Sequence, residues 1–151
     1  MSKQVTLGSE ARTNLVKGID ILADAVVSTL GPNGRNAVIA NEQGTPQSTK
    51  DGVTVAKSIS LKDPNQELGV QLVKQAAIKT AEKAGDGTTT ATVLAELLLN
   101  EVNASDVNIR EIKDGIKSGL TKVNDDLDKI SVKIEGEMRK SVSSISCNND
   151  E

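Results

Sequence analysis

Residues 85–90, Gly-Asp-Gly-Thr-Thr-Thr, combine residue types that can bind a phosphate group and a metal ion. They precede an apolar stretch with helical spacing, and the free amides at the start of a helix form an anion site. The glycines let the backbone approach a phosphate closely, while Thr88, Thr89 and Thr90 add hydroxyl donors. The carboxylate of Asp86 can hold Mg²⁺ against phosphate oxygens. A glycine turn with threonine caps fits the same residues, and the sequence contains no Walker A pattern.

Two further glycine-containing segments follow predicted elements. Residues 29–35, Thr-Leu-Gly-Pro-Asn-Gly-Arg, come after the first predicted helix, and residues 50–52, Lys-Asp-Gly, come after a predicted hairpin. Taken singly, each segment also fits an ordinary turn. Together with residues 85–90 they are three loops that can converge on one nucleotide. Lys50 would supply a cation suited to phosphate, and Asp51 a second carboxylate.

The elements before residue 60 are predicted to be a helix, a hairpin and one ambiguous segment. Ser9 is the expected N-cap of the helix, which continues to Leu30 and ends before a Gly-Pro pair. Residues 37–40 form the first strand of the hairpin, and residues 41–46 form its turn. Residues 52–59 fit a strand because of their Val and Thr, and also fit a short helix capped by the preceding aspartate.

Three longer helices are predicted in the remainder. Asp63 as N-cap and Pro64 at the first helical position mark the start of the first. The second begins at Thr88 or Thr89, and the third spans residues 109–130. The first carries a narrow apolar stripe with small residues, at Leu68, Leu72, Ala76, Thr80 and Ala84. The buried side of the second is expected at Ala91, Leu94, Leu97, Leu98 and Val102, and apolar residues recur at helical spacing in the third at Ile109, Ile112, Ile116, Leu120, Val123, Leu127 and Ile130. From residue 131 onward the helical pattern decays, so a mainly α-helical fold is expected before it.

Composition limits the possible partners. The 151 residues include no Phe, Tyr or Trp and carry a net charge of −3. Without base-stacking side chains or a basic field, nucleic acid is not an expected partner. The single cysteine, Cys147, and the lack of histidine exclude an internal disulfide and leave a zinc site too few ligands. No apolar run reaches membrane-spanning length and the first residues are polar, so a cytoplasmic protein without membrane contact is expected.

Four blocks of this sequence resemble the N-terminal blocks of the group I chaperonin large subunit, the GroEL family. They occur in the family's order and at nearly its spacing. The blocks are Ala23-Asp24-Ala25-Val26, Thr29-Leu30-Gly31-Pro32 with Gly34-Arg35-Asn36, Thr49-Lys50-Asp51-Gly52-Val53, and residues 84–95. The likeness covers nearly the whole chain. It implies a mainly α chaperonin equatorial-type helical domain with a small β-hairpin, incomplete, over residues 1–131, and the start of a truncated intermediate domain at 132–151.

The resemblance also implies roles for the three loops. The ATP-binding positions would be Thr29, Leu30, Gly31, Pro32, Lys50, Asp86, Gly87, Thr88, Thr89 and Thr90. Asp86 would hold Mg²⁺, and Lys50 would lie near phosphate and a bound potassium ion. Asp51 matches a carboxylate near the γ-phosphate, which gives it an auxiliary catalytic role.

The function implied by the resemblance is that of an ATP-dependent chaperonin subunit, a cytoplasmic ATPase and folding isomerase that works in a ring of like subunits. The family's chain is several times longer. The parts that grip co-chaperonin and unfolded clients, and the aspartate that activates water, have no counterpart here. Asn33 stands where relatives often have lysine, and the connection at residues 103–108 looks short. Two alternatives stay open: a truncated, non-hydrolysing fragment that docks on or regulates complete rings, and an unrelated small helical phosphate-binding protein.

Overall fold

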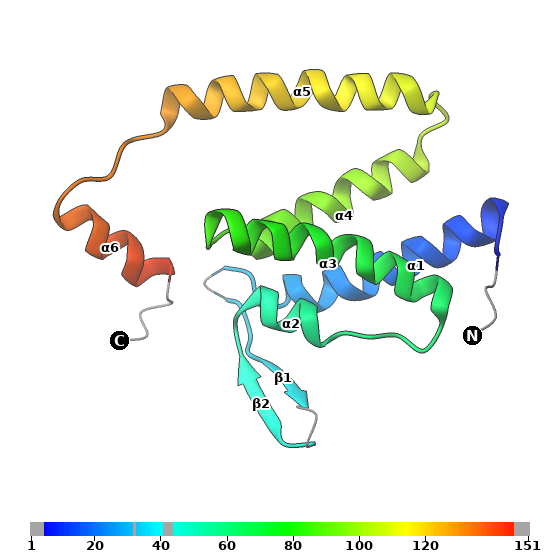
Figure 1. Ribbon diagram of the computed structural model, residues 1–151, viewed down its shortest axis with the longest axis horizontal. Coiled ribbons are helices and arrows are strands. Elements are labelled where there is room, and N and C mark those ends of the chain that lie inside the picture. The colour runs from blue at the N-terminus through cyan, green and yellow to red at the C-terminus, as the bar shows by residue number, and fades with distance from the viewer. Residues whose placement is uncertain (1–4, 32, 41–43, 147–151) are drawn as a thin grey trace. The chain divides into compact units, whose positions relative to one another are not determined.

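The computed structural model describes residues 5–31, 33–40 and 44–146, and its contacts divide the chain into two units, 1–104 and 105–151. The first unit holds most of the elements (Figure 1). They are α1 (Gly8–Val27), β1 (Ala37–Ala40), β2 (Pro46–Thr49), α2 (Gly52–Ser58), α3 (Pro64–Ala84) and α4 (Thr88–Ala104). The expectation of a mainly α-helical fold with a small hairpin is confirmed.

The first unit is built around three mutually packed helices, α1, α3 and α4, with α2 in contact with all three. The fully buried side chains Leu22, Val26, Val70 and Val73 form the centre of the core. Burial of such aliphatic side chains is the main stabilising contribution in a domain without aromatic residues.

Two glycines let α1 and α3 approach closely. A Cβ added at Gly18 would lie 1.9 Å from the carbonyl oxygen of Gln66, and one added at Gly69 would lie 2.1 Å from that of Leu15. Neither helix could keep this spacing with any larger residue at these positions, because the added atom would overlap a backbone oxygen.

The buried face of α3 differs from the predicted apolar stripe. Leu68 and Leu72 are 59% and 50% exposed, whereas Val70, Val73 and Ala77 are buried. The close approach through Gly69 turns that side of α3 toward α1, which leaves the predicted stripe outside the core.

The buried face predicted for α4 is also wrong in the described structure. Leu94, Leu97 and Leu98 are exposed, and the buried residue of this helix is Thr92.

The hairpin has the predicted first strand. β1 and β2 pair antiparallel, with Ala37 opposite Thr49 and Ala40 opposite Pro46. In Figure 1 the hairpin extends away from the helices beside α2. Three residues of the predicted turn, 41–43, lie outside the described residues, as do Pro32 and Cys147.

Two boundaries of α1 differ from prediction. The N-cap is Leu7, not Ser9, and no side chain caps the helix. At the other end α1 stops at Val27, before Leu30. The backbone then tightens into three-residue turns, in which Thr29 N donates to Val26 O at 3.1 Å.

The ambiguous segment is a helix. In α2 the Asp51 side chain accepts hydrogen bonds from Val53 N and Thr54 N, so the N-cap outweighs the strand preference of its Val and Thr. The predicted start of α3 is confirmed as well, since Asp63 accepts from Asn65 N and Gln66 N with Pro64 in the first turn.

The second unit contains α5 (Ile109–Ile130) and α6 (Glu137–Ser146). The predicted span of α5 is confirmed, and Asn108 caps it by accepting from Arg110 N at 2.9 Å. The short α6 was not predicted. Neither helix has a buried residue, and the expected boundary between equatorial and intermediate regions at residue 131 stays a prediction. No helix in the described part of the chain is long and apolar enough to cross a membrane.

Candidate functional site

The turn between α3 and α4 leaves the first amides of α4 outside the helical hydrogen bonds. Gly85 adopts a left-handed conformation at φ 74° and closes α3 by donating its amide to Ala81 O at 3.0 Å. Gly87 also has a left-handed backbone conformation, at φ 80°, and directly precedes the first residue of α4. The first helical bond of α4 runs from Ala91 N to Gly87 O, at 2.9 Å. The amides of residues 88–90 therefore precede the helical hydrogen bonds and carry the positive end of the helix dipole.

Asp86 lies exposed at this helix start. Its Oδ1 accepts from the amide of Gly87 at 2.6 Å, and among the described residues it makes no ion pair. The remaining lone pairs face solvent, which suits a Mg²⁺ ion that keeps most of its ligands as water and phosphate oxygens. In the described part of the chain no group of three or more Asp, Glu, Cys or His residues could hold a metal ion.

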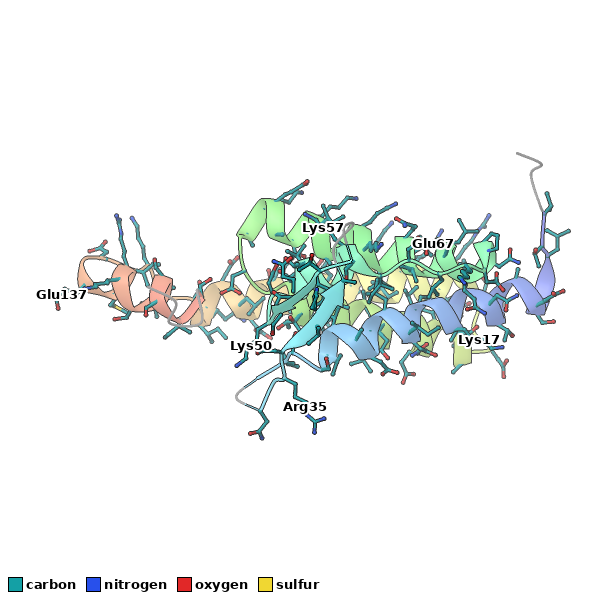
Figure 2. The ribbon with its side chains drawn as sticks, turned by 90° about the horizontal axis from the view of Figure 1, so that it is seen from below. Lys17, Arg35, Lys50, Lys57, Glu67 and Glu137 are labelled. Carbon is teal, nitrogen blue, oxygen red and sulfur yellow. The ribbon has the colours of Figure 1, made fainter. Side chains whose placement is uncertain are left out.

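Asp51 holds the start of α2. Its carboxylate accepts from Val53 N at 3.2 Å, from Thr54 N at 2.9 Å and from the Thr54 hydroxyl, while its own amide donates to Thr49 Oγ1 at 3.1 Å. A carboxylate oxygen can accept more than one hydrogen bond, so a second role at the same position is chemically open. The neighbouring Lys50 is exposed and without an ion pair in the described structure (Figure 2).

The starts of α2 and α4 meet at Gly52. A Cβ added there would lie 2.4 Å from Thr89 Oγ1 and 3.4 Å from Val26 Cγ1. The end of α1, the start of α2 and the start of α4 therefore come together at Gly52, where a larger residue would have to displace the Thr89 hydroxyl. One helical turn after Thr88 in α4, Thr92 is fully buried, and its hydroxyl donates to Thr88 O at 2.9 Å.

The loop after α1 folds back on itself. Thr29 is buried, and its hydroxyl donates to Val26 O at 2.7 Å. Arg35 N donates to Ser28 O at 2.8 Å, and Gly34 lies against the Thr29 carbonyl, where an added Cβ would be 2.2 Å away. Leu30 and Gly31 are exposed at its tip, and the Arg35 side chain points away from the helices in Figure 2.

The structure thus brings Gly52, after Asp51, against Thr89 at the start of α4, and Val26 at the end of α1, which Thr29 bonds, also lies beside Gly52. It leaves Lys50 and Asp86 exposed beside this junction, without a direct contact between them in the described residues. The sequence predicted that the three loops can converge, but not that Gly52 and Thr89 meet, since their contact depends on packing of elements far apart in the chain.

Sequence reasoning also missed Lys74, which is 8% exposed and bonds the end of α2. This lysine shares the face of α3 that carries Val70, Val73 and Ala77, a face that the apolar stripe of the sequence did not indicate.

Two glutamates near the core have shifted titration. The pKa of Glu96 on α4 is raised by burial and then by the charges of Asp20 and Asp24 on α1. The pKa of Glu67 on α3 is lowered, first by the Leu61 amide that it accepts at 2.7 Å and then by Gln71. Both residues lie outside the loops described above, and they report on packing rather than on the site.

The chain matches one protein family and is similar to solved structures of a chaperonin. The sequence model of the TCP-1/cpn60 chaperonin family matches residues 22–150. Among solved structures, the chain is similar to the chaperonin gp146 from the bacteriophage EL 2 (Pseudomonas aeruginosa), crystallised in the presence of ATP-BeFx. In one crystal form the match has a TM-score of 0.82 and 33% identity over 95% of this chain. In the other the TM-score is 0.75, with 28% identity over 94%. The chain spans 26% and 28% of those two chains.

Proposed function

Because the chain belongs to the TCP-1/cpn60 chaperonin family, we propose that it is part of a chaperonin subunit that binds ATP and Mg²⁺ and assists protein folding. The observation that carries this proposal is the junction at Gly52, where three loop-bearing segments meet. The gp146 crystals were grown with ATP-BeFx, which supports a nucleotide as the ligand. Family membership also argues against the alternative of an unrelated phosphate-binding protein.

Each part of the junction has a role in this proposal. The amides and hydroxyls of Thr88, Thr89 and Thr90, with the Gly87 backbone, bind the phosphates, and Asp86 holds the metal. Mg²⁺, when bound, offsets the repulsion between this carboxylate and the nucleotide. Lys50 adds positive charge near the phosphates. A potassium ion, which the resemblance implies, would bind close to the same residue. The nucleotide is lined by the first loop, at Thr29, Leu30, Gly31 and Pro32, the last of which lies outside the described residues.

Asp51 has a dual role in this account. It caps α2 and thereby fixes the junction, and it acts as an auxiliary catalytic carboxylate near the γ-phosphate. Phosphoryl transfer to water depends mainly on positioning and electrostatics. Since these loops supply binding groups, and the family's water-activating aspartate has no counterpart here, we expect this chain alone to bind Mg–ATP and to hydrolyse it negligibly.

The wider assignments follow the family. Residues 1–131 belong to the equatorial domain and residues 132–151 begin the intermediate domain. The subunit works in the cytoplasm in a ring of like subunits, and co-chaperonin and clients bind elsewhere in the complete protein.

A second candidate is a non-hydrolysing fragment that docks on or regulates complete rings. The exposed apolar faces of α4 and α5 favour it, because such faces gain stability when a partner covers them.

Calorimetric titration of Mg–ATP into the wild-type chain and Asp86→Ala tests the proposed function. We expect Asp86→Ala to weaken binding by about tenfold or more, the equivalent of one lost charge-assisted contact. Asp114→Ala removes an exposed carboxylate of α5 and serves as the matched control, with affinity unchanged. Equal affinities for the wild type and Asp86→Ala, with equal helix content, would refute the metal role.

A further inference from the structure

Lys74 is a buried lysine on α3. It is 8% exposed on the face that packs Val70, Val73 and Ala77 into the core. Its Nζ donates to the carbonyl oxygen of Lys57 at 3.3 Å and to that of Ile59. No carboxylate forms an ion pair with it in the described structure. A buried ammonium group is costly unless hydrogen bonded, and these two carbonyls supply its hydrogen bonds, while the charge of Glu67 adds a longer-range attraction.

The two carbonyls lie at the C-terminal end of α2. This helix has seven residues, too few to be stable without outside contacts. Its first amides are bonded by Asp51, and its last carbonyls, which carry the negative end of the dipole, are bonded by Lys74. A short, rigid helix held at both ends transmits its position from one end to the other.

We propose that Lys74 is a positioning residue for the nucleotide site. By holding the C-terminal end of α2, it fixes Asp51 and Gly52 at the other end against Thr89 of α4. The inference rests on the proposed function for its effect on nucleotide binding. The structural part of the inference, that Lys74 fixes the position of α2, does not depend on the proposed function.

The side chain suits this task. A lysine has three donors on a flexible stem, so it reaches from α3 to two carbonyls of a neighbouring segment while its methylenes pack in the core. An apolar residue of similar length would fill the same space and leave both carbonyls unbonded. Packing and positioning can therefore be separated by substitution.

The test uses the full chain and the variants Lys74→Met, Lys74→Arg and Val73→Ala. Hydrogen exchange is followed at the amides of Val53 and Thr54, which donate to Asp51, and Mg–ATP affinity is measured by calorimetry. We expect Lys74→Met to speed exchange at both amides by about tenfold, the loss of roughly one charge-assisted hydrogen bond, and to weaken Mg–ATP binding severalfold. Lys74→Arg should restore most of both.

Val73→Ala is the matched control. It removes a buried core side chain one residue away and lowers global stability, but valine donates no hydrogen bond to either α2 carbonyl, so Mg–ATP affinity of the folded chain should stay unchanged. If Lys74→Met does not fold, Lys74→Gln takes its place, because its shorter, neutral amide loses the charge-assisted hydrogen bonds at a lower cost of burial and should still speed exchange. Unchanged exchange at Val53 and Thr54 in the folded variant overturns the inference. So does an equal loss of affinity in Val73→Ala.

Failure of the proposed function gives a different result. If the wild-type chain does not bind Mg–ATP, the nucleotide assignment fails, and the exchange rates alone decide whether Lys74 fixes α2. Faster exchange in Lys74→Met then supports the structural part, and unchanged exchange refutes it.

Discussion

The two units of the chain are both helical, but they differ in what their helices bury. In the first unit Leu22, Val26 and Val70 are fully enclosed, whereas α5 in the second has no buried residue and Leu120 is 58% exposed. Yet α5 has the most regular apolar pattern in the sequence. Periodicity therefore predicts that a helix forms and which side is apolar. Burial needs a second element that can approach, and in the first unit Gly18 and Gly69 provide that approach.

The largest expected contrast comes from a matched pair of leucines. Leu22→Ala should lower the free energy of unfolding by about 2–5 kcal/mol, because it removes a fully buried side chain and leaves a cavity. Leu120→Ala should change it by less than about 1 kcal/mol, since most of that side chain is already in water. Far-ultraviolet dichroism during denaturant unfolding is the suitable measurement in a chain without aromatic residues. Equal losses would show that α5 is covered in solution.

A matched pair of glycines gives the next largest contrast. Gly69→Ala should destabilise by about 1–3 kcal/mol, because the added methyl would overlap the Leu15 carbonyl and separate α1 from α3. Gly119→Ala meets nothing within 4 Å and should stabilise α5 by roughly 0.5–1 kcal/mol through helix propensity. Thermal unfolding followed by dichroism distinguishes the two signs. A stabilising effect of Gly69→Ala would contradict the close packing of these helices.

The apolar face of α5 has a consequence for association. Because this face is exposed, we expect the chain to be helical but loosely packed, or to self-associate as its concentration rises. Sedimentation velocity across a range of concentrations measures this. A dilute monomer that melts in one sharp cooperative step, α5 included, would mean that the helices close a core of their own.

The smallest expected effects are on the pH dependence of stability, to which two glutamates of the first unit contribute with opposite signs. The folded-state pKa of Glu67 is lowered, so its contribution to stability is present above the unfolded value of 4.5 and is lost as pH falls through the folded pKa. The folded-state pKa of Glu96 is raised, so ionisation of this residue destabilises the folded chain. This loss of stability is absent below the unfolded pKa of 4.5 and appears as pH rises through the folded pKa.

Thermal midpoints at pH 7 and at pH 4 test these signs. Glu67→Gln should lower the midpoint at pH 7 and Glu96→Gln should raise it, and both differences should shrink at pH 4. Glu135→Gln, an exposed residue of the second unit, controls for the loss of one charge. A pH-independent difference in either variant would assign its effect to packing instead of titration.

Much of this fold could be read from local signals. Asp63 and Pro64 mark the start of α3 correctly, because capping depends only on neighbouring residues. The buried face of α3 could not be predicted from local signals, because Gly69 and Lys74 lie on it and neither residue type indicates burial by itself. Leu94, Leu97 and Leu98 of α4 show the opposite error, since an apolar face is buried only where a neighbour covers it.

The candidate site divides in the same way. The three loops were predicted from glycine, threonine and aspartate at element ends, which are local features. Their junction at Gly52 depends on α1, α2 and α4 meeting across dozens of residues, and local signals carry no such information.

Hydrogen exchange of the whole chain, with and without Mg–ATP, tests most directly the claim that a nucleotide binds where these loops meet. The account predicts slower exchange at residues 28–35, 51–54 and 87–91, where the loops and helix starts lie, and no change at residues 109–130 of α5. Protection should be lost when Mg²⁺ is removed or when Asp86 is replaced by alanine. Protection confined to α5, or none at the three loops at saturating Mg–ATP, would contradict the account.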